Sequence, residues 1–98
     1  MARPILLAVH EDVRDREVLE RELTDRYSRG YQIICEASPL SALERLHSLH
    51  ATAGASVLIL FAANQMTAMP GLQFLERAHE LYPHAQRVLL VPKSNRSA

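Results

Sequence analysis

The chain has 98 residues, the length of one small domain. It carries 11 Lys and Arg residues against 11 Asp and Glu residues, so its formal net charge is zero, and none of its segments is strongly basic. This balance argues against a nucleic-acid partner or an anionic membrane, because both bind clusters of Lys and Arg. No apolar run reaches the roughly 20 residues that span a bilayer, and the N-terminus has no signal-peptide pattern. The lone Cys35 cannot form an internal disulfide, which indicates a reducing, cytoplasmic setting.

The first strand is predicted at residues 5–9, where ILLAV is a continuous apolar run typical of strands covered on both faces. A charged segment with helical spacing of its apolar residues follows, and Asp12 or Asp15 is its expected N-cap. We expect Gly30 just past the end of this helix. The predicted buried face of the helix consists of Val18, Leu19, Leu23 and Tyr27.

The second strand is predicted at residues 31–37, which read YQIICEA. A second helix is expected after it, with Ser38 as the N-cap and Pro39 at the first helical position, where proline is tolerated. The predicted apolar face of this helix consists of Leu40, Leu43, Leu46 and Leu49.

The third strand is predicted at residues 56–62, since SVLILFA is the most apolar part of the chain. The loop AANQMTAMPG leads from it into a third helix, which Pro83 should end. A fourth strand is expected at residues 87–91, which read RVLLV. The expected inward face of the third helix consists of Leu72, Leu75, Ala78 and Leu81.

Strands that alternate with helices of this length predict an α/β fold with a parallel sheet and helices on both faces. Sites in such sheets lie at the carboxyl ends of the strands, near the switch in winding direction. Two segments that follow predicted strands are therefore candidate site segments: HED at residues 10–12 and AANQM at residues 62–66. A dinucleotide site or a P-loop would need a glycine-rich turn after the first strand. That turn reads VHEDVRD and contains no glycine, so both are excluded.

The same two segments resemble those of response-regulator receiver domains, the flavodoxin-like signalling modules. ILLAVHEDVRDREVLERELTDRY is similar to the usual start, and SVLILFAANQMTAMPGLQFLERAHELYPHAQRVLLV to the usual middle. Met66, Met69 and Gly71 keep the MxxMxG frame of the loop after the third strand. The resemblance implies a three-layer α/β/α fold. Residues 1–98 would be a single receiver-like domain truncated after the fourth strand, lacking the last helix, strand and helix of the family.

The resemblance also implies that the phosphoryl-transfer chemistry is lost. The family's acid pair, which helps to hold Mg²⁺, falls on His10 and Glu11, with Asp12 close by. Imidazole is a poor ligand for Mg²⁺, which prefers hard oxygen donors. The phosphoacceptor aspartate falls on Ala63, whose methyl group cannot attack phosphorus, and the family's phosphate-sensing hydroxyl falls on Val91. The lysine that pairs with the phosphate would lie beyond residue 98.

We therefore predict a degenerate receiver, which acts as a regulatory module through protein contacts and is not phosphorylated on aspartate. No cofactor, metal or catalytic residue is expected, and the chain by itself is not an enzyme. The candidate interaction loop consists of Asn64, Met66, Thr67 and Met69, with Thr67 in place of the family's proline. A shifted loop frame would put Asn64 at the acceptor position, but an amide is no better as a nucleophile.

Two alternatives remain open. The overall pattern is similar to the receiver segment ahead of thioredoxin-reductase-like flavoproteins, so the chain could be the N-terminal regulatory segment of a flavin-dependent oxidoreductase. It could also be a receiver that is still phosphorylated with the help of His10, Glu11 or Asp12.

The expected partner is another protein or a covalently linked downstream domain. The predicted strand at 87–91 would lie at a sheet edge, where unpaired backbone groups are a template for another chain. We therefore expect self-association through this strand, unless the rest of a longer protein covers it.

Overall fold

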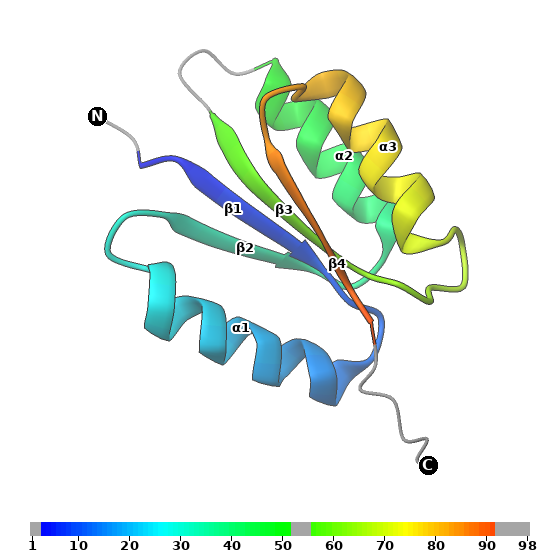
Figure 1. Cartoon of the computed structure of the whole chain (residues 1–98), viewed down its shortest axis with the longest axis horizontal. Coiled ribbons are helices and arrows are strands. Elements are labelled where there is room, and N and C mark those ends of the chain that lie inside the picture. The colour runs from blue at the N-terminus through cyan, green and yellow to red at the C-terminus, as the bar shows by residue number, and fades with distance from the viewer. Residues whose placement is uncertain (1–2, 52–55, 92–98) are drawn as a thin grey trace.

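The computed structural model describes residues 3–51 and 56–91 of the chain. Strands and helices alternate in the predicted order, with seven elements along the chain: β1 (Ile5–Val9), α1 (Val13–Tyr27), β2 (Gln32–Glu36), α2 (Pro39–His50), β3 (Val57–Ala63), α3 (Gly71–Leu81) and β4 (Gln86–Leu90). The strands pair in parallel in the order β2-β1-β3-β4. Helix α1 covers one face of the sheet, and α2 and α3 cover the other (Figure 1). The predicted three-layer α/β/α architecture with a parallel sheet is confirmed.

The core lies on both faces of β1, whose five residues are all buried. Leu7 and Val9 face a cluster on the side of α2 and α3, which also contains Leu60 and Phe74. Leu6 and Ala8 face a smaller cluster beneath α1. Alternate side chains of a strand point to opposite faces, so a central strand buried on both faces must be apolar at every position.

Two helices begin at side-chain caps that the sequence predicts. The side chain of Asp12, rather than that of Asp15, caps α1 by accepting a 2.9 Å hydrogen bond from the Asp15 N–H. Ser38 Oγ accepts a 3.1 Å hydrogen bond from the Ser41 N–H at the start of α2, where Pro39 takes the first position. The prediction for the end of α1 is wrong by two residues. Ser28 is its C-cap, and Gly30 lies in the turn beyond.

Strands β2, β3 and β4 each differ from the prediction by one residue at both ends, because backbone pairing rather than hydrophobicity sets the boundaries. Tyr31 is excluded from β2, since its N–H bonds to the carbonyl of Tyr27 in the turn after α1. Ala63 is the last residue of β3, because it pairs with Leu90. Strand β4 begins at Gln86, one residue earlier than predicted, because Gln86 pairs with Ile59.

Each predicted helix face includes one residue that the structure exposes. Leu72 is 55% exposed while Phe74 is buried, and Leu40 is 56% exposed while Ala42 is buried. Residues two apart lie about 200° apart around a helix, so burying Phe74 or Ala42 turns its partner to solvent. Val18 of α1 is likewise 48% exposed, although Leu23 is buried.

Candidate functional site

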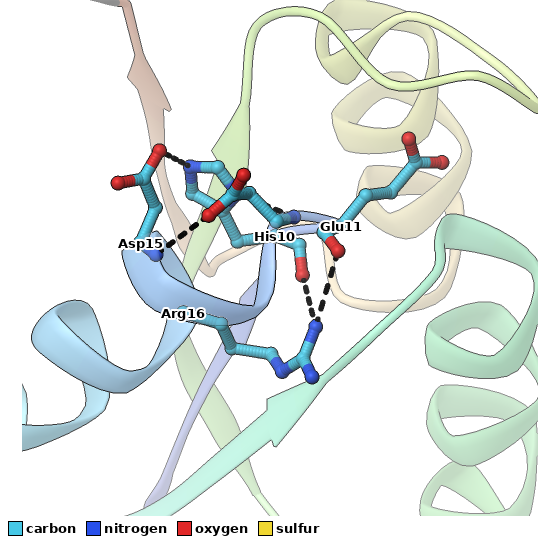
Figure 2. Close-up of polar contacts among 5 residues, drawn as sticks. His10, Glu11, Asp15 and Arg16 are labelled. Carbon is cyan, nitrogen blue, oxygen red and sulfur yellow. Dashed lines mark hydrogen bonds and ion pairs between the residues drawn. The ribbon is translucent and has the colours of Figure 1, made fainter.

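The carboxyl end of β1 is held by polar contacts with the start of α1 (Figure 2). The Asp12 N–H donates to His10 Nδ1 at 3.3 Å, and His10 Nε2 lies 3.8 Å from Asp15 Oδ2. The Arg16 guanidinium donates to the carbonyl oxygens of His10 at 3.0 Å and of Glu11 at 3.3 Å. Arg16 therefore holds the backbone of His10 and Glu11, the two residues at the positions of the family's acid pair.

The side chain of Glu11 points away from the His10–Asp15 pair (Figure 2) and binds the loop after β3. Its two carboxylate oxygens accept hydrogen bonds from the Thr67 N–H at 2.8 and 2.9 Å. The Thr67 hydroxyl donates a further bond to Glu11 Oε1 at 2.9 Å. The hydrogen bond from the Thr67 backbone is the main cause that lowers the pKa of Glu11 from its ordinary value of 4.5. We call this set of contacts the Glu11–Thr67 clamp.

The end of β3 carries a methyl group where the resemblance places an acceptor carboxylate. Ala63 is 5% exposed and packs in the core beneath the loop. The next residue, Asn64, is held by its backbone, since its N–H donates to the Leu90 carbonyl at 2.7 Å and its carbonyl accepts from the Gly71 N–H at 3.0 Å. The amide side chain of Asn64 is half-buried. No carboxylate from β3 itself can reach this end of the sheet.

In the loop from Asn64 to Pro70, the two methionines pack against the core and the threonine is exposed to solvent. Met66 is buried in the core, and Met69 packs against the same core while partly exposed. Thr67 is exposed. The structure thus places Met66 under the loop rather than on its surface, because both methionines fill space between the sheet and α3.

Gly71 is required by a close contact between the start of α3 and the end of β3. A Cβ atom at this position would lie 2.0 Å from the carbonyl oxygen of Ala63 and 2.9 Å from its carbonyl carbon. Both are backbone atoms, so neither can swing aside as a flexible side chain does. The glycine of the MxxMxG frame therefore lets the helix cross directly over the strand end.

Two cavities flank this region, and most of the predicted site residues line one or the other, while Asn64 lines both. The first, of about 380 Å³, lies between α1 and the ends of β3 and β4. It is lined by His10, Asp15, Val18, Leu19, Glu22, Ala63, Asn64, Gln65, Leu90 and Val91. The second, of about 410 Å³, is lined by Glu11, Asn64, Gln65, Met66, Thr67 and Pro70.

His10 and Glu11 therefore face different cavities, although they are adjacent in the sequence. Asp12 is exposed and is occupied in capping α1, and Val91, at 64% exposure, lines the first cavity with a side chain that has no hydroxyl. Within residues 3–51 and 56–91, no three His, Cys, Asp or Glu side chains form a group that could hold a metal ion. The predicted positions thus gather at one end of the sheet without forming a shared acidic pocket.

Sequence reasoning missed the two contacts that organise this end of the sheet. Glu11 and Thr67 are 56 positions apart, and the main donor is a backbone N–H, which leaves no signature in the sequence. Arg16 is a polar residue on a charged helix, and nothing local distinguishes it from the other arginines there. Only its place as the fourth residue of α1, about one turn from the helix start, brings it near the carbonyl groups of His10 and Glu11.

Among the solved structures similar to this chain is the signal receiver domain of an HD domain-containing protein from Pseudomonas fluorescens Pf-5. The TM-score is 0.68 and the sequence identity is 27%, over 93% of this chain and 66% of that chain. No family model and no curated protein matches the sequence. The chain has the flavodoxin-like fold of a receiver domain, as the sequence predicts. None of the described helices is long and apolar enough to cross a membrane.

Proposed function

We propose that this chain is a degenerate receiver, a regulatory module that acts in signal transduction through protein contacts and without aspartyl phosphorylation. The observation that carries the proposal is Ala63, a buried methyl group at the end of β3, in a chain whose fold is that of a receiver domain. Phosphoryl transfer to a side chain requires a nucleophilic oxygen in line with the phosphorus atom. Alanine offers none.

The Glu11–Thr67 clamp supports the same proposal, because it concerns the residue that would help to bind Mg²⁺. Glu11 Oε1 accepts two hydrogen bonds from Thr67 and Oε2 accepts one, so part of the acceptor capacity of this carboxylate is used by the loop instead of a cation. Mg²⁺ demands near-ideal octahedral oxygen geometry and loses its water reluctantly. The clamp joins the segment after β1 to the β3–α3 loop through protein groups, and this contact supports a loop position that does not depend on phosphorylation.

The module would therefore present a fixed surface rather than one switched by a phosphoryl group. The exposed residues of this loop are Gln65, Thr67, Ala68 and Pro70, and Asn64 is half-exposed beside them. Its proposed role is contact with a protein partner or a linked domain, in the cytoplasm, and it supplies no catalytic group of its own.

The test is incubation with acetyl phosphate and Mg²⁺, followed by intact mass measurement and ¹H–¹⁵N NMR spectra. We expect no added phosphoryl group, and no chemical-shift change at Thr67 or Asn64 on adding millimolar Mg²⁺ or beryllofluoride. A receiver domain that keeps its aspartate serves as the positive control in the same reaction. A covalent phosphoryl adduct on Glu11, Asp12 or His10 would overturn the proposal and establish the phosphorylated alternative.

A further inference from the structure

The carboxyl end of the sheet carries exposed aliphatic side chains where the helices begin. In a parallel sheet each helix starts near the end of the strand before it, so all three helix starts lie around the same end. Val13, Leu40 and Leu72 occupy the first or second position of their helices, and each is more than half exposed. The helix dipole favours acidic side chains in the first turn, so it gives no reason for aliphatic ones. We call these three residues the apolar rim.

A single carboxylate lines the cavity that lies between two parts of this rim. Glu11 stands two residues before Val13, and Pro70 stands two residues before Leu72. Both Glu11 and Pro70 line the cavity of about 410 Å³, and Glu11 is the only charged residue among the described residues that line it. The cavity therefore opens at the centre of this end of the sheet.

The charge of Glu11 is not balanced by a basic side chain in the described chain. The hydrogen bond from the Thr67 backbone lowers the pKa of Glu11 below its ordinary value of 4.5, so the carboxylate is ionised at neutral pH. Within residues 3–51 and 56–91, no arginine forms an ion pair with it. The cavity thus presents a fixed negative charge to whatever approaches this end of the sheet.

The other groups around the cavity suit the guanidinium group of an arginine. Glu11 Oε2 accepts one hydrogen bond from the protein, which leaves acceptor capacity on this oxygen. Asn64 and Gln65 line the same cavity, and each amide side chain has a carbonyl acceptor. Met66 and Pro70 provide apolar walls for the aliphatic stem of a long side chain. Arginine has five N–H donors in a planar fork and is more weakly hydrated than lysine, so it is the better match for several separate acceptors.

We propose that this end of the sheet is the docking surface of a protein partner that inserts an arginine side chain into the Glu11 cavity and packs neighbouring apolar residues on the apolar rim. Arginine is enriched among the interface residues that dominate binding energy, and the contacts around such residues exclude water. The proposal rests on the proposed role in protein contacts and specifies the chemistry of the partner. It does not depend on the acetyl phosphate test, so the two can fail separately.

The first experiment selects binders to the protein from a random linear peptide library displayed on phage, and measures their affinities by fluorescence anisotropy. We expect the enriched peptides to carry an arginine beside apolar residues. Glu11→Gln in the protein, or citrulline in place of the arginine, should each weaken binding about 10-fold, because each removes one partner of the same charged pair. The two changes together should weaken binding no further than either alone.

The combined change shows whether the charge of Glu11 acts directly. If the two losses add, Glu11 acts through the position of the loop rather than by pairing with the arginine, which would overturn the proposal. Enrichment of peptides without arginine, or of no peptide at all, would also overturn it. Glu80→Gln is the matched control, because it removes an exposed carboxylate near the end of α3, at the opposite end of the sheet. It should leave the affinity unchanged.

The second experiment tests the apolar rim with the same peptides. Val13→Ser and Leu72→Ser should each weaken binding severalfold, because each removes an apolar contact surface. Leu58→Ser is the matched control, since Leu58 is 40% exposed but lies near the amino end of β3. This control should bind as wild type does, and circular dichroism checks that each variant is folded. Unchanged binding of both rim variants, or an equal loss in the Leu58→Ser control, would overturn the proposal.

Discussion

Replacing Gly71 with alanine should destabilise the protein strongly, because the added methyl group would enter the space that the end of β3 occupies. The new Cβ would lie 2.0 Å from the Ala63 carbonyl oxygen, which is about 1.5 Å closer than a normal van der Waals contact. Overpacking of this kind costs about 3 kcal/mol or more when only backbone can yield. Alanine also lowers the conformational entropy of the unfolded chain, which stabilises the folded state by at most about 1 kcal/mol. The net loss is therefore at least about 2 kcal/mol.

A loss of this size should lower the midpoint of thermal unfolding by about 8–16 °C in a domain of this length. The assay is thermal and urea unfolding followed by circular dichroism, with Gly30→Ala as the matched control. A Cβ at Gly30 would meet no atom within 4 Å, so that variant should be unchanged or stabilised by about 0.4–1 kcal/mol. If Gly71→Ala unfolds within about 0.5 kcal/mol of wild type, then α3 does not cross β3 as closely as described.

Two further predictions concern ionisable side chains. Because the clamp depresses the folded pKa of Glu11, its stabilising contribution should be complete above pH 4.5 and disappear as pH falls through the folded pKa. Urea unfolding of wild type and Glu11→Gln across this range should therefore show a difference that shrinks on acidification, and a difference independent of pH would contradict the clamp. For Cys35, burial is the main cause that raises the thiol pKa from 9.0 to about 11. Its thiolate population, and with it the rate of alkylation by iodoacetamide at pH 8, should be about 100-fold lower in the folded protein than in urea. Equal rates in the two states would show that the thiol is not shielded.

The element order and the layered architecture were predictable because they depend on local signals. A strand buried on both faces must be continuously apolar, and β1 and most of β3 are the runs that satisfy this condition. Ser38 and Pro39 identify the start of α2, because capping and the fixed φ of proline act within one turn. The proposed loss of the acceptor carboxylate likewise rests on a local feature, the residue type at Ala63.

The buried face of each helix was predictable only in part, because the helical spacing of apolar residues is compatible with more than one set of residues facing the sheet. In α3 the leucine pattern favours Leu72, but burial of the bulkier Phe74 turns that position to solvent. In α2 the small Ala42 is buried in the core, and Leu40, two positions earlier, is turned to solvent as a result. The choice between such arcs depends on the volume available between helix and sheet.

The sequence by itself determined the parallel α/β architecture and the methyl side chain at the end of β3, because both follow from the residue types along the chain. Only the tertiary structure decided which contacts the residues at the strand ends make. Adjacent residues His10 and Glu11 face different cavities, and Glu11 binds a backbone N–H of Thr67, 56 positions away. Gly71 is required because α3 crosses the end of β3 within contact distance. Such contacts depend on how separate segments meet in space, and no local pattern of residues encodes the donor or the distance.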